Sequence, residues 1–476
     1  MASPARTRAT ILAHHLYDFA ECEHRVALDA TLDRELRSPP DAAMELLFRH
    51  GQEFERTIVE PLGYPAVAVE HGDWDGAFAH TVALMRDGAR GIDQGVLLDG
   101  ARLARPDLLE RVEGSSELGE FHFIPGDVKS ARTTRSDAVF QVGFAALLLE
   151  AVQGRRPDIG FLVLGDGRRE RLDLESIRFT IDDAVARAEE IARGDVTTSP
   201  FISSRCGRCR WRGECLPRLE QARDLSFVHG VTRSRRRALA RHGVATIDDL
   251  ASSDIERLAS QGVPPDGLPR MQAQARALID GKVVRRGAAT LPRTAGRELY
   301  LRIETDPLDG GEPFSIAWGE TASGGALRES RVTIVSDSDE RSATLGDMLE
   351  QFESPAVRGA PIFTFGSGTA SAFDALAEAQ RVDPARAGDL AGRLVDLAPW
   401  VRRAAVLPVF RYGFDEVAAV VRGLPRPSPD ESEDALFVTH AGMTASDDPD
   451  RARRSLEAAG REALESLHAI RMWLAT

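Results

Sequence analysis

Hydrophobic and polar positions divide the chain into three regions. Residues 1–222 alternate helix-like and strand-like patterns, residues 223–283 show short helical stretches separated by glycines, and residues 297–476 carry a further set of strands and helices. A linker, "RRGAATLPRTAGRE", separates the second region from the third. The pattern therefore predicts a multidomain α/β protein.

The first region predicts a strand pair followed by a helix and a buried strand. The segments "GVLLDGARLARPDLLERV" and "EFHFIPGDVKS" suit strands, and the loop "EGSSELG" between them favours antiparallel pairing. The next segment predicts a helix with Asp137 as N-cap and Gly154 as C-cap. The continuous apolar run "IGFLVLG" that follows is typical of a buried central strand.

The composition is that of an ordinary soluble protein. The 476 residues are 43% hydrophobic and 28% charged, which is enough for several cores. No apolar run approaches the roughly 20 residues of a membrane span, and the N-terminal "MASPARTRAT" lacks the apolar segment of a secretory signal. We therefore expect a cytoplasmic protein with no membrane partner.

The net charge of −14 argues against a chain that coats nucleic acid through bulk electrostatics. The local distribution differs, because eleven arginines and three acidic residues lie between Arg205 and His242, an excess of eight positive charges. A solvated surface in an arginine-biased chain explains this segment as well as a nucleic-acid interface does. Three successive arginines, Arg235 to Arg237, favour a patch over scatter.

Lysine is almost absent from the chain, so the position of Lys129 is informative. Only Lys129 and Lys282 are lysines among 60 Lys and Arg residues. On a strand, Asp127 and Lys129 project to the same face, and Asp107 lies on the predicted partner strand about 4.8 Å away. Carboxylates in this arrangement suit a hard ion such as Mg²⁺, which activates water for attack on a phosphodiester. A compact ammonium beside the ion can position the water or stabilise the transition state, a role that the planar guanidinium of arginine does not fill.

Asp-x-Lys alone also arises by chance on strands, but here further residues accompany it. Pro106-Asp107 followed by Asp127-Val128-Lys129 resembles the PD-(D/E)xK nuclease signature. The resemblance implies a restriction-endonuclease-like core and a metal-dependent phosphodiesterase.

Two neighbouring segments resemble the RecB-like branch of the same nucleases. Gln141 matches a glutamine on the next helix, and "HGQEFE" places Glu55 where a metal-binding histidine often lies. Ala145 departs from the aromatic residue expected on that helix, while a carboxylate at position 55 can still ligate a hard metal. The catalytic set that the resemblance implies is Glu55, Asp107, Asp127, Lys129 and Gln141, with Mg²⁺ or Mn²⁺ held by Glu55, Asp107 and Asp127.

The four cysteines comprise one N-terminal thiol and a C-x2-C-x5-C cluster. A disulfide framework does not suit a chain expected in the cytoplasm. Four thiolates can hold Zn²⁺ tetrahedrally or a [4Fe-4S] cluster, and three free buried thiols within ten residues would be unusual. Structural zinc more often uses two matched C-x2-C pairs. The candidate ligands are Cys22, Cys206, Cys209 and Cys215.

The distant cysteine and the compact trio, on either side of the nuclease motifs, resemble the iron-sulfur RecB-type nucleases. That group includes CRISPR-associated exonucleases and bacterial helicase-nucleases. "YDFAECEHRVALD" and "CGRCRWRGEC" carry the resemblance, which covers about 215 residues. It implies a [4Fe-4S] cluster, with zinc as the alternative, that ties the N-terminal helix to the segment after the nuclease core. It also implies single-stranded or helicase-unwound DNA as substrate and a helicase as partner.

The second region resembles a helix-hairpin-helix over "HGVTRSRRRALARHGVATIDDLA", with Gly230 in the hairpin and Thr232 in place of the usual second glycine. The resemblance implies that hairpin N–H groups contact phosphate. A small helical packing module explains the pattern equally well. The candidate nucleic-acid-binding residues are Arg233, Arg235, Arg236 and Arg237.

The third region, which begins "ELYLRIETDP", resembles the RNase H-like exonuclease domain of some RecB-family nucleases. Such domains carry Asp-x-Glu on their first strand, because two metal ions need several carboxylates. Here Arg302 replaces the aspartate, and Glu304 and Asp396 are the carboxylates that remain. Ala459 and Ala463 stand where a tyrosine and an aspartate are expected. Because an arginine repels a metal ion, we expect an RNase H-like fold without catalysis.

Taken together, the motifs predict a metal-dependent DNA nuclease, an exonuclease on single-stranded or unwound DNA that serves repair, recombination or defence. Two alternatives stay open: a nucleic-acid-binding scaffold with a structural or redox-sensing cluster, and a zinc-stabilised interaction protein. The intact Asp107, Asp127 and Lys129 favour the nuclease over the scaffold.

Overall fold

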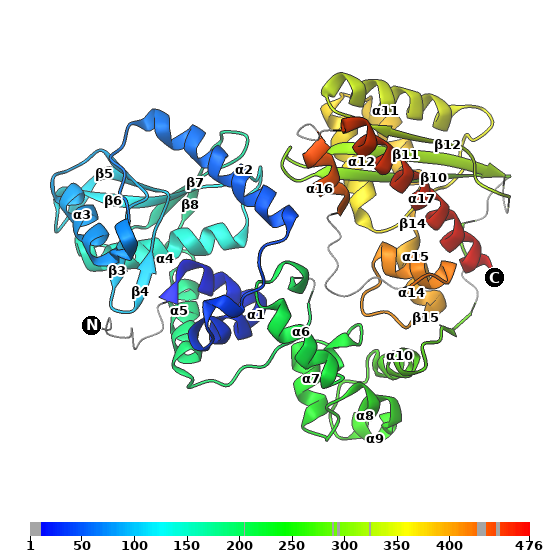
Figure 1. The fold of residues 1–476 in the computed structure, drawn as a ribbon, viewed down its shortest axis with the longest axis horizontal. Coiled ribbons are helices and arrows are strands. Elements are labelled where there is room, and N and C mark those ends of the chain that lie inside the picture. The colour runs from blue at the N-terminus through cyan, green and yellow to red at the C-terminus, as the bar shows by residue number, and fades with distance from the viewer. Residues whose placement is uncertain are drawn as a thin grey trace. The chain divides into compact units, whose positions relative to one another are not determined.

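A computed structural model gives the fold of the chain (Figure 1). It describes residues 11–203, 205–287, 290–292, 296–322, 325–425, 435–443 and 448–476. The architecture is α/β with several sheets, as the sequence predicts. The chain forms two compact units: unit 1 is Met1–Phe201 with Cys209–Cys215, and unit 2 is Ile202–Arg208 with Leu216–Thr476.

A five-stranded mixed sheet forms the centre of unit 1, with the order β2-β5-β6-β7-β8. Strands β5 and β6 pair antiparallel, which confirms the predicted strand pair, and β7 lies parallel to β6. A smaller sheet has the order β1-β4-β3. The strands are β1 (Ile11–Leu12), β2 (Gly91–Asp93), β3 (Leu97–Asp99), β4 (Arg102–Ala104), β5 (Leu108–Ser116), β6 (Gly119–Val128), β7 (Ile159–Val163) and β8 (Arg169–Asp173).

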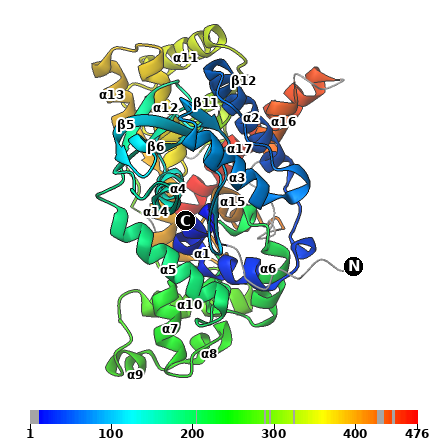
Figure 2. The ribbon, with the colours of Figure 1, turned by 90° about the vertical axis from the view of Figure 1, so that its left-hand side faces the viewer.

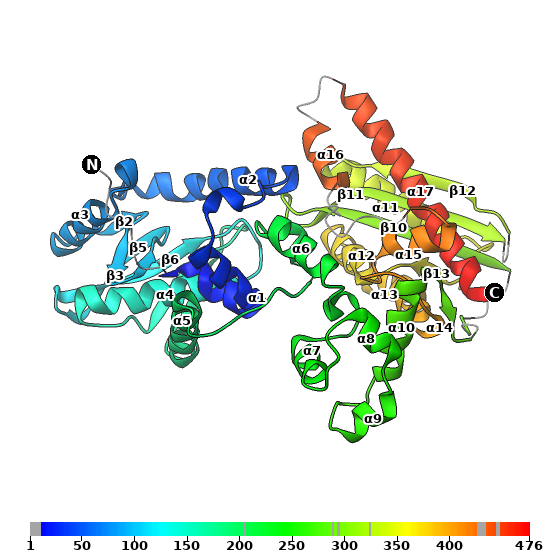
Figure 3. The same cartoon turned by 60° about the horizontal axis from the view of Figure 1, so that its bottom comes forward.

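Helices cover both faces of the five-stranded sheet. Helix α2 packs through residues such as Ile58 against Ile124 and Val128, whereas α4 packs on the face that carries Phe123 (Figure 3). This arrangement follows from the two-residue alternation of a strand, which sends neighbouring side chains to opposite faces. The helices are α1 (Ala13–Thr31), α2 (Ala42–Val59), α3 (Trp74–Arg86), α4 (Ser136–Gln153) and α5 (Arg178–Arg193).

Helix α4 is the apolar helix that the sequence predicts. It begins at Ser136, so Arg135 rather than Asp137 occupies the N-cap, and it ends at Gly154, whose φ of +63° gives the left-handed C-cap that favours glycine. By length and composition it is also the one described helix that could cross a membrane. Its side chains lie buried in two hydrophobic clusters of unit 1, which is the environment of a core helix.

The helical region 223–283 belongs to unit 2, where its helices gather around one hydrophobic core (Figure 2). Thr232 caps α7 by accepting the Arg235 N–H at 3.2 Å, and Thr246 with Asp249 forms a capping box at α8. These caps define short helices as the sequence predicts. The helices of this region are α7 (Arg233–Ala240), α8 (Ile247–Ser252), α9 (Ile255–Ser260) and α10 (Leu268–Asp280). Helix α6 (Arg212–Gln221) precedes them, with its first residues in unit 1 and the rest in unit 2.

The C-terminal part of unit 2 contains a second five-stranded sheet, with the order β12-β11-β10-β13-β14. Its first three strands pair antiparallel, and β13 and β14 join them in parallel. A further antiparallel pair joins β9 and β15. The strands are β9 (Val284–Arg285), β10 (Arg297–Asp306), β11 (Glu312–Ala322), β12 (Arg328–Ile334), β13 (Ile362–Thr364), β14 (Leu394–Asp396) and β15 (Ala405–Val406).

Alternation along β10 decides which side chains face which helices. Leu299 and Leu301 pack against α11, α12 and α13, whereas Tyr300 packs with α14, α15 and α17. Arg302 and Glu304 therefore project on the face of Tyr300. The helices are α11 (Ser338–Glu353), α12 (Ser367–Ala379), α13 (Pro384–Arg393), α14 (Leu397–Ala404), α15 (Phe414–Arg422), α16 (Ala435–Met443) and α17 (Pro449–Ala475).

Candidate functional site

Asp107 and Asp127 lie opposite each other at one end of the β5–β6 pair in unit 1. The antiparallel register pairs Leu108 with Gly126, so the residues that flank this pair face each other. Asp107 Oδ2 accepts the backbone N–H of Val128 at 2.8 Å, which fixes that carboxylate against the end of β6. Asp127 is buried, with an exposed fraction of 6%, and Asp107 is half-buried.

Lys129 stands directly beside Asp127. Its Nζ lies 2.5 Å from Asp127 Oδ2, and its backbone N–H continues the sheet by donating to Val163 O at 2.9 Å. Burial lowers the pKa of Lys129, but the negative charges of Asp127 and Asp107 outweigh burial and raise it above the ordinary value. The side chain is therefore a permanent cation at neutral pH, suited to donate hydrogen bonds and unsuited to act as a base.

Glu55 reaches the same place from α2, and Gln94 joins it to the strands. The Gln94 side-chain amide donates to Glu55 Oε1 and, at 3.1 Å, to Asp107 Oδ1. Its backbone N–H also donates to Asp107 O at 2.9 Å. The side-chain amide of Gln94 thus donates one hydrogen bond to each of two carboxylates. Gln94 has a φ of +54°, a conformation that costs a non-glycine residue about 1–3 kcal/mol and is often found at functional sites.

The carboxylates crowd one another. Burial raises the pKa of Asp107 well above its ordinary value, and the charges of Asp127 and Glu55 raise it further. Burial likewise raises the pKa of Glu55, opposed by the hydrogen bond from Gln94 and reinforced by the charges of Asp127 and Asp93. One lysine does not balance this much negative charge. A bound cation would balance it, and hard divalent ions take carboxylate ligands. The carboxylate oxygens of Glu55, Asp107 and Asp127 do not all lie within 4.8 Å of one another, whereas among the described residues the ligand atoms of His14, His15 and Asp29 do, so metal binding by the three carboxylates stays a prediction.

The sequence-predicted residues behave differently in the structure. Glu55, Asp107, Asp127 and Lys129 come together, whereas Gln141 lies half-buried in the second turn of α4 with no hydrogen bond to the carboxylates among the described residues. Gln94 and Asp93 were not predicted. The segment "GIDQG" offers no signal for them, because their role depends on a contact between β2, the loop after it and α2.

The cysteine-rich segment packs on the N-terminal helix of unit 1. Cys209 and Trp211 form a small buried cluster with Leu28 of α1, against which Cys215 also lies. Helix α1 is interrupted at Cys22, where φ is −160° and ψ is 93°. The sulfurs of these three unit 1 cysteines do not all come within 4.8 Å of one another, and Cys206 belongs to unit 2. None of the four cysteines forms a disulfide.

Asp29 of α1 holds the cysteine-rich segment in place. The Trp211 indole N–H donates to Asp29 Oδ1 at 2.8 Å, and Arg37 donates to the same oxygen. The imidazoles of His14 and His15 approach Oδ2 to 3.6 Å and 3.3 Å. Burial raises the pKa of Asp29, but these surrounding donors outweigh burial and hold the pKa far below its ordinary value. The carboxylate therefore stays ionised and anchors three segments of unit 1.

The hairpin of the helical region is largely occupied by contacts inside unit 2. Gly230 has a φ of +87°, as expected for a hairpin glycine. The His229 N–H donates to Gln274 Oε1 at 3.1 Å, and the Val228 and Val231 N–H groups are bonded to backbone oxygens. Phosphate would have to displace these acceptors to reach the N–H groups.

Arg235 and Arg236, two of the candidate arginines on α7, pair with residues of unit 2. Arg236 pairs with Asp224 at 3.1 Å, and both side chains are 16% exposed. Arg235 donates to the Asp266 carbonyl. Arg233 is half-buried and Arg237 is exposed. The arginine run thus serves in part to hold the helices together, and its contact with nucleic acid stays a prediction.

In the third region, the remaining carboxylates lie beside a cavity of unit 2 but are already satisfied. Arg302 Nε donates to Glu304 Oε1 at 2.6 Å, and its guanidinium lies 4.6 Å from the centre of the Phe414 ring. Asp396 Oδ1 accepts the N–H groups of Gly366 and Ala398 at 2.7 Å and 2.9 Å, the second contact capping α14. Arg302 thus neutralises Glu304, and Asp396 has one of its two oxygens engaged by backbone N–H groups.

Comparison of the chain with protein-family models gives no match, and comparison with curated proteins gives none either.

Proposed function

We propose that the chain is a metal-dependent DNA nuclease of the PD-(D/E)xK type, with its active site in unit 1. The observation that carries the proposal is the convergence of Glu55, Asp107 and Asp127 from three separate elements, with Lys129 at 2.5 Å from Asp127. The antiparallel pair, the parallel strand β7 and a helix on each face support a restriction-endonuclease-like core.

Glu55, Asp107 and Asp127 would hold Mg²⁺ or Mn²⁺. Support comes from the placement of the three carboxylates around Gln94 and Lys129. Burial first, and then the charge of Asp127, raises the pKa of both Asp107 and Glu55, and a bound cation would offset both effects. When bound, a divalent ion supplies Lewis-acid polarisation of the phosphoryl oxygen and a water of lowered pKa.

The chain's own residues position the phosphodiester and its surroundings. Lys129, kept protonated by its aspartate neighbours, donates hydrogen bonds toward the negative charge that grows on the phosphoryl oxygens. Asp127 orients the ammonium, and Gln94 fixes the carboxylates of Glu55 and Asp107 relative to each other. Gln141 on α4 is proposed to border the substrate path.

The four cysteines are proposed to hold a [4Fe-4S] cluster, with zinc as the alternative. Cys22 lies at the interruption of α1, and the segment with Cys209 and Cys215 packs on the same helix, which supports joint ligation. One zinc ion with Zn–S bonds of about 2.3 Å holds its sulfurs less than about 4 Å apart. The preference for the larger cluster rests on the C-x2-C-x5-C spacing with one distant cysteine, since structural zinc more often uses two matched C-x2-C pairs.

Single-stranded or helicase-unwound DNA is the proposed substrate, and a helicase the proposed partner. The alternative function is a nucleic-acid-binding scaffold in which neither unit cleaves a substrate. The surplus carboxylates of unit 1 favour the nuclease, since a scaffold has no need of uncompensated buried charge.

The decisive experiment is degradation of labelled single- and double-stranded DNA with and without Mg²⁺ or Mn²⁺. We expect metal-dependent cleavage by the full chain and none by Asp127→Asn. Binding of DNA without cleavage by either protein, under any metal, would favour the scaffold.

A further inference from the structure

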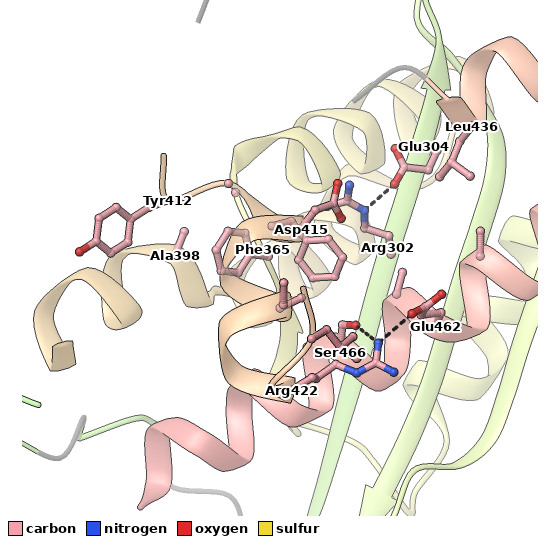
Figure 4. Close-up of a pocket in the computed structure, with 18 of the residues that line it drawn as sticks. Arg302, Glu304, Phe365, Ala398, Tyr412, Asp415, Arg422, Leu436, Glu462 and Ser466 are labelled. Atoms are coloured by element: carbon pink, nitrogen blue, oxygen red, sulfur yellow. Dashed lines mark hydrogen bonds and ion pairs between the residues drawn. The ribbon is translucent and has the colours of Figure 1, made fainter. Parts of the chain in front are cut away.

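Unit 2 contains a cavity of about 1010 Å³ on the face of β10 that carries Arg302 and Glu304 (Figure 4). Helices α14, α15 and α17, the start of α12, the first residues of α16 and the segment after α15 also contribute to its walls. Many of the wall residues are small, among them Ala398, Ala418 and Ala459, which leaves the space open. A cavity of this volume accommodates a ligand of the size of a nucleotide.

The arginines that line the cavity differ in whether a carboxylate of the protein pairs with them. Arg302 pairs with Glu304 at 2.6 Å, and Arg422 pairs with Glu462 at 3.0 Å and donates to Ser466 at 2.9 Å. Figure 4 shows these pairs on one side of the cavity and Tyr412 on the other. These arginines therefore have their counter-charges within the protein.

Arg402 on α14 is the exception. It is half-buried and lines the cavity, yet across the described residues it has no carboxylate within 4.0 Å and no hydrogen-bond acceptor. Of the carboxylates that line the cavity, Asp396 accepts two backbone N–H groups and Asp415 is exposed on the first turn of α15. The guanidinium of Arg402 is thus available to an anion supplied from outside, and guanidinium groups pair well with phosphate.

Further positive charge lies around Tyr412, a residue of the cavity wall, on Arg270, which does not line the cavity itself. The guanidinium of Arg270 on α10 lies 5.9 Å from the centre of the Tyr412 ring, and its hydrogen-bond acceptor is the Ala405 carbonyl at 3.4 Å. The His229 ring lies 4.9 Å from the same ring. Burial lowers the pKa of His229, and the charges of Arg402 and Arg270 lower it further, which places both guanidinium groups near this imidazole.

We propose that this cavity binds a nucleoside phosphate, with the phosphoryl group held by Arg402 and Arg270 and the nucleoside in the space beside Phe414. Guanidinium groups match phosphate oxygens in geometry as well as charge. The ligand is either a free nucleotide or the terminal nucleotide of a strand, because both present the same phosphoryl chemistry. The site stands independently of catalysis in unit 1.

The test is equilibrium binding to the full chain in buffer with EDTA, which suppresses metal-dependent cleavage. The probes are thymidine 5′-monophosphate, thymidine, inorganic phosphate, and a short single strand with and without a 5′-phosphate. Arg402→Ala is compared with Arg403→Ala, its exposed neighbour, which does not line the cavity. Arg270→Ala is the second site variant, and thermal unfolding verifies that each variant is folded.

We expect the monophosphate to bind about tenfold or more tightly than thymidine, and Arg402→Ala and Arg270→Ala each to weaken it about tenfold, while Arg403→Ala changes it less than about twofold. An Arg402-dependent preference for the phosphorylated strand identifies a strand end, and binding of the mononucleotide alone identifies a free nucleotide. Equal affinity for thymidine and its monophosphate, or equal losses in Arg402→Ala and Arg403→Ala, would overturn the proposal.

The same measurement in Asp127→Asn separates this site from the proposed nuclease. Arg402-dependent binding that persists in Asp127→Asn supports the cavity whatever the outcome of the cleavage assay. Loss of all monophosphate binding in a folded Asp127→Asn chain would place the phosphate site in unit 1 and refute the cavity.

Discussion

The two units repeat one local geometry with different consequences. On β6 and just beyond it, Asp127 and Lys129 stand two positions apart and form an ion pair of 2.5 Å, and on β10 Arg302 and Glu304 do the same at 2.6 Å. The difference lies in what surrounds each pair. In unit 1, Asp107 and Glu55 add negative charge, whereas in unit 2 the Phe414 ring covers the arginine.

An acid–base pair on a strand is therefore not itself a metal site. In unit 2 the charges of Arg302 and Glu304 cancel, so an added cation finds no excess negative charge there and is repelled by the arginine. In unit 1 the same kind of pair leaves carboxylates in excess, and a cation has something to neutralise. The surplus of carboxylates, rather than the strand motif, distinguishes the proposed catalytic unit.

The largest expected effect comes from removing a carboxylate in each unit. Asp127→Asn should reduce metal-dependent cleavage by about 10³-fold or more, equivalent to about 4 kcal/mol of transition-state stabilisation, because no second site compensates. Glu304→Ala should leave the rate within about twofold, since Glu304 only neutralises Arg302. Cleavage rates on labelled DNA measure both. Activity that survives Asp127→Asn and vanishes in Glu304→Ala would reverse the roles of the units.

The cysteines offer a second contrast between the units. Cys209→Ser should abolish bound iron and lower the unfolding temperature of unit 1, because ligation of a metal centre is coupled to folding. Unit 2 should keep its own unfolding transition. Iron analysis and the visible spectrum of anaerobically purified protein, with scanning calorimetry, provide the measurements.

Ser38→Ala is the control for the cysteine variant. It removes the hydroxyl that accepts the Gly213 N–H at 3.2 Å in the same segment, but no thiol. Its iron content should match that of the parent chain. Unchanged iron content and unfolding temperature in Cys209→Ser would count against the cluster.

Replacing Lys129 by arginine, and Arg302 by lysine, tests the role of Lys129 directly. Lys129→Arg should lower the cleavage rate about 10²-fold, because the planar guanidinium does not place its charge where the compact ammonium does. Arg302→Lys preserves the charge in unit 2 and should leave the rate within about twofold. Equal rates for Lys129→Arg and the parent chain would show that a positive charge of any shape suffices.

The smallest effect concerns the dependence of stability on pH. Asp107 and Glu55 have pKa values raised above 3.8 and 4.5, so the folded metal-free chain holds protons that the unfolded chain releases. Their contribution to stability is present below about pH 4 and is lost as the pH rises through the folded pKa values. Mg²⁺ should restore stability increasingly with pH, by about 2.7 kcal/mol at 100 times its Kd.

Chemical denaturation at several pH values, with and without Mg²⁺, measures this restoration. Glu304→Ala should show the same Mg²⁺ effect as the parent chain, and Asp127→Asn should lose it. A Mg²⁺ effect that is lost in Glu304→Ala instead would move the ion to unit 2.

Local patterns in the sequence predicted the local parts of the fold. The antiparallel partner of β6 and the helix that ends at Gly154 were correct, because a turn-like loop and a glycine C-cap act over few residues. The segment 95–112, which contains Asp107, was predicted to suit a strand, but it is divided among β3, β4 and the start of β5. A turn at Gly100 with φ of +60° and Pro106, which lacks an N–H, interrupt the pairing.

Contacts between residues far apart in the chain could not be predicted from the sequence patterns. Gln94 is separated from Glu55 by 39 residues, and no motif marks the amide that bridges two carboxylates. The predicted phosphate-binding hairpin was assigned from its glycine, but the acceptor of its His229 N–H is Gln274, 45 residues later. In both cases the tertiary partner, which periodicity does not reveal, determines what the residue can do.

The packing of residues 209–215 on α1 also determines when unit 1 can finish folding during synthesis of the chain. Asp29 receives the Trp211 indole only after 182 further residues have been translated, an interval on the order of 10 to 40 s. During that interval Leu28 lacks the cover that Cys209 and Trp211 later provide. Unit 1 begins first at the ribosome but is completed only when the start of unit 2 has also emerged.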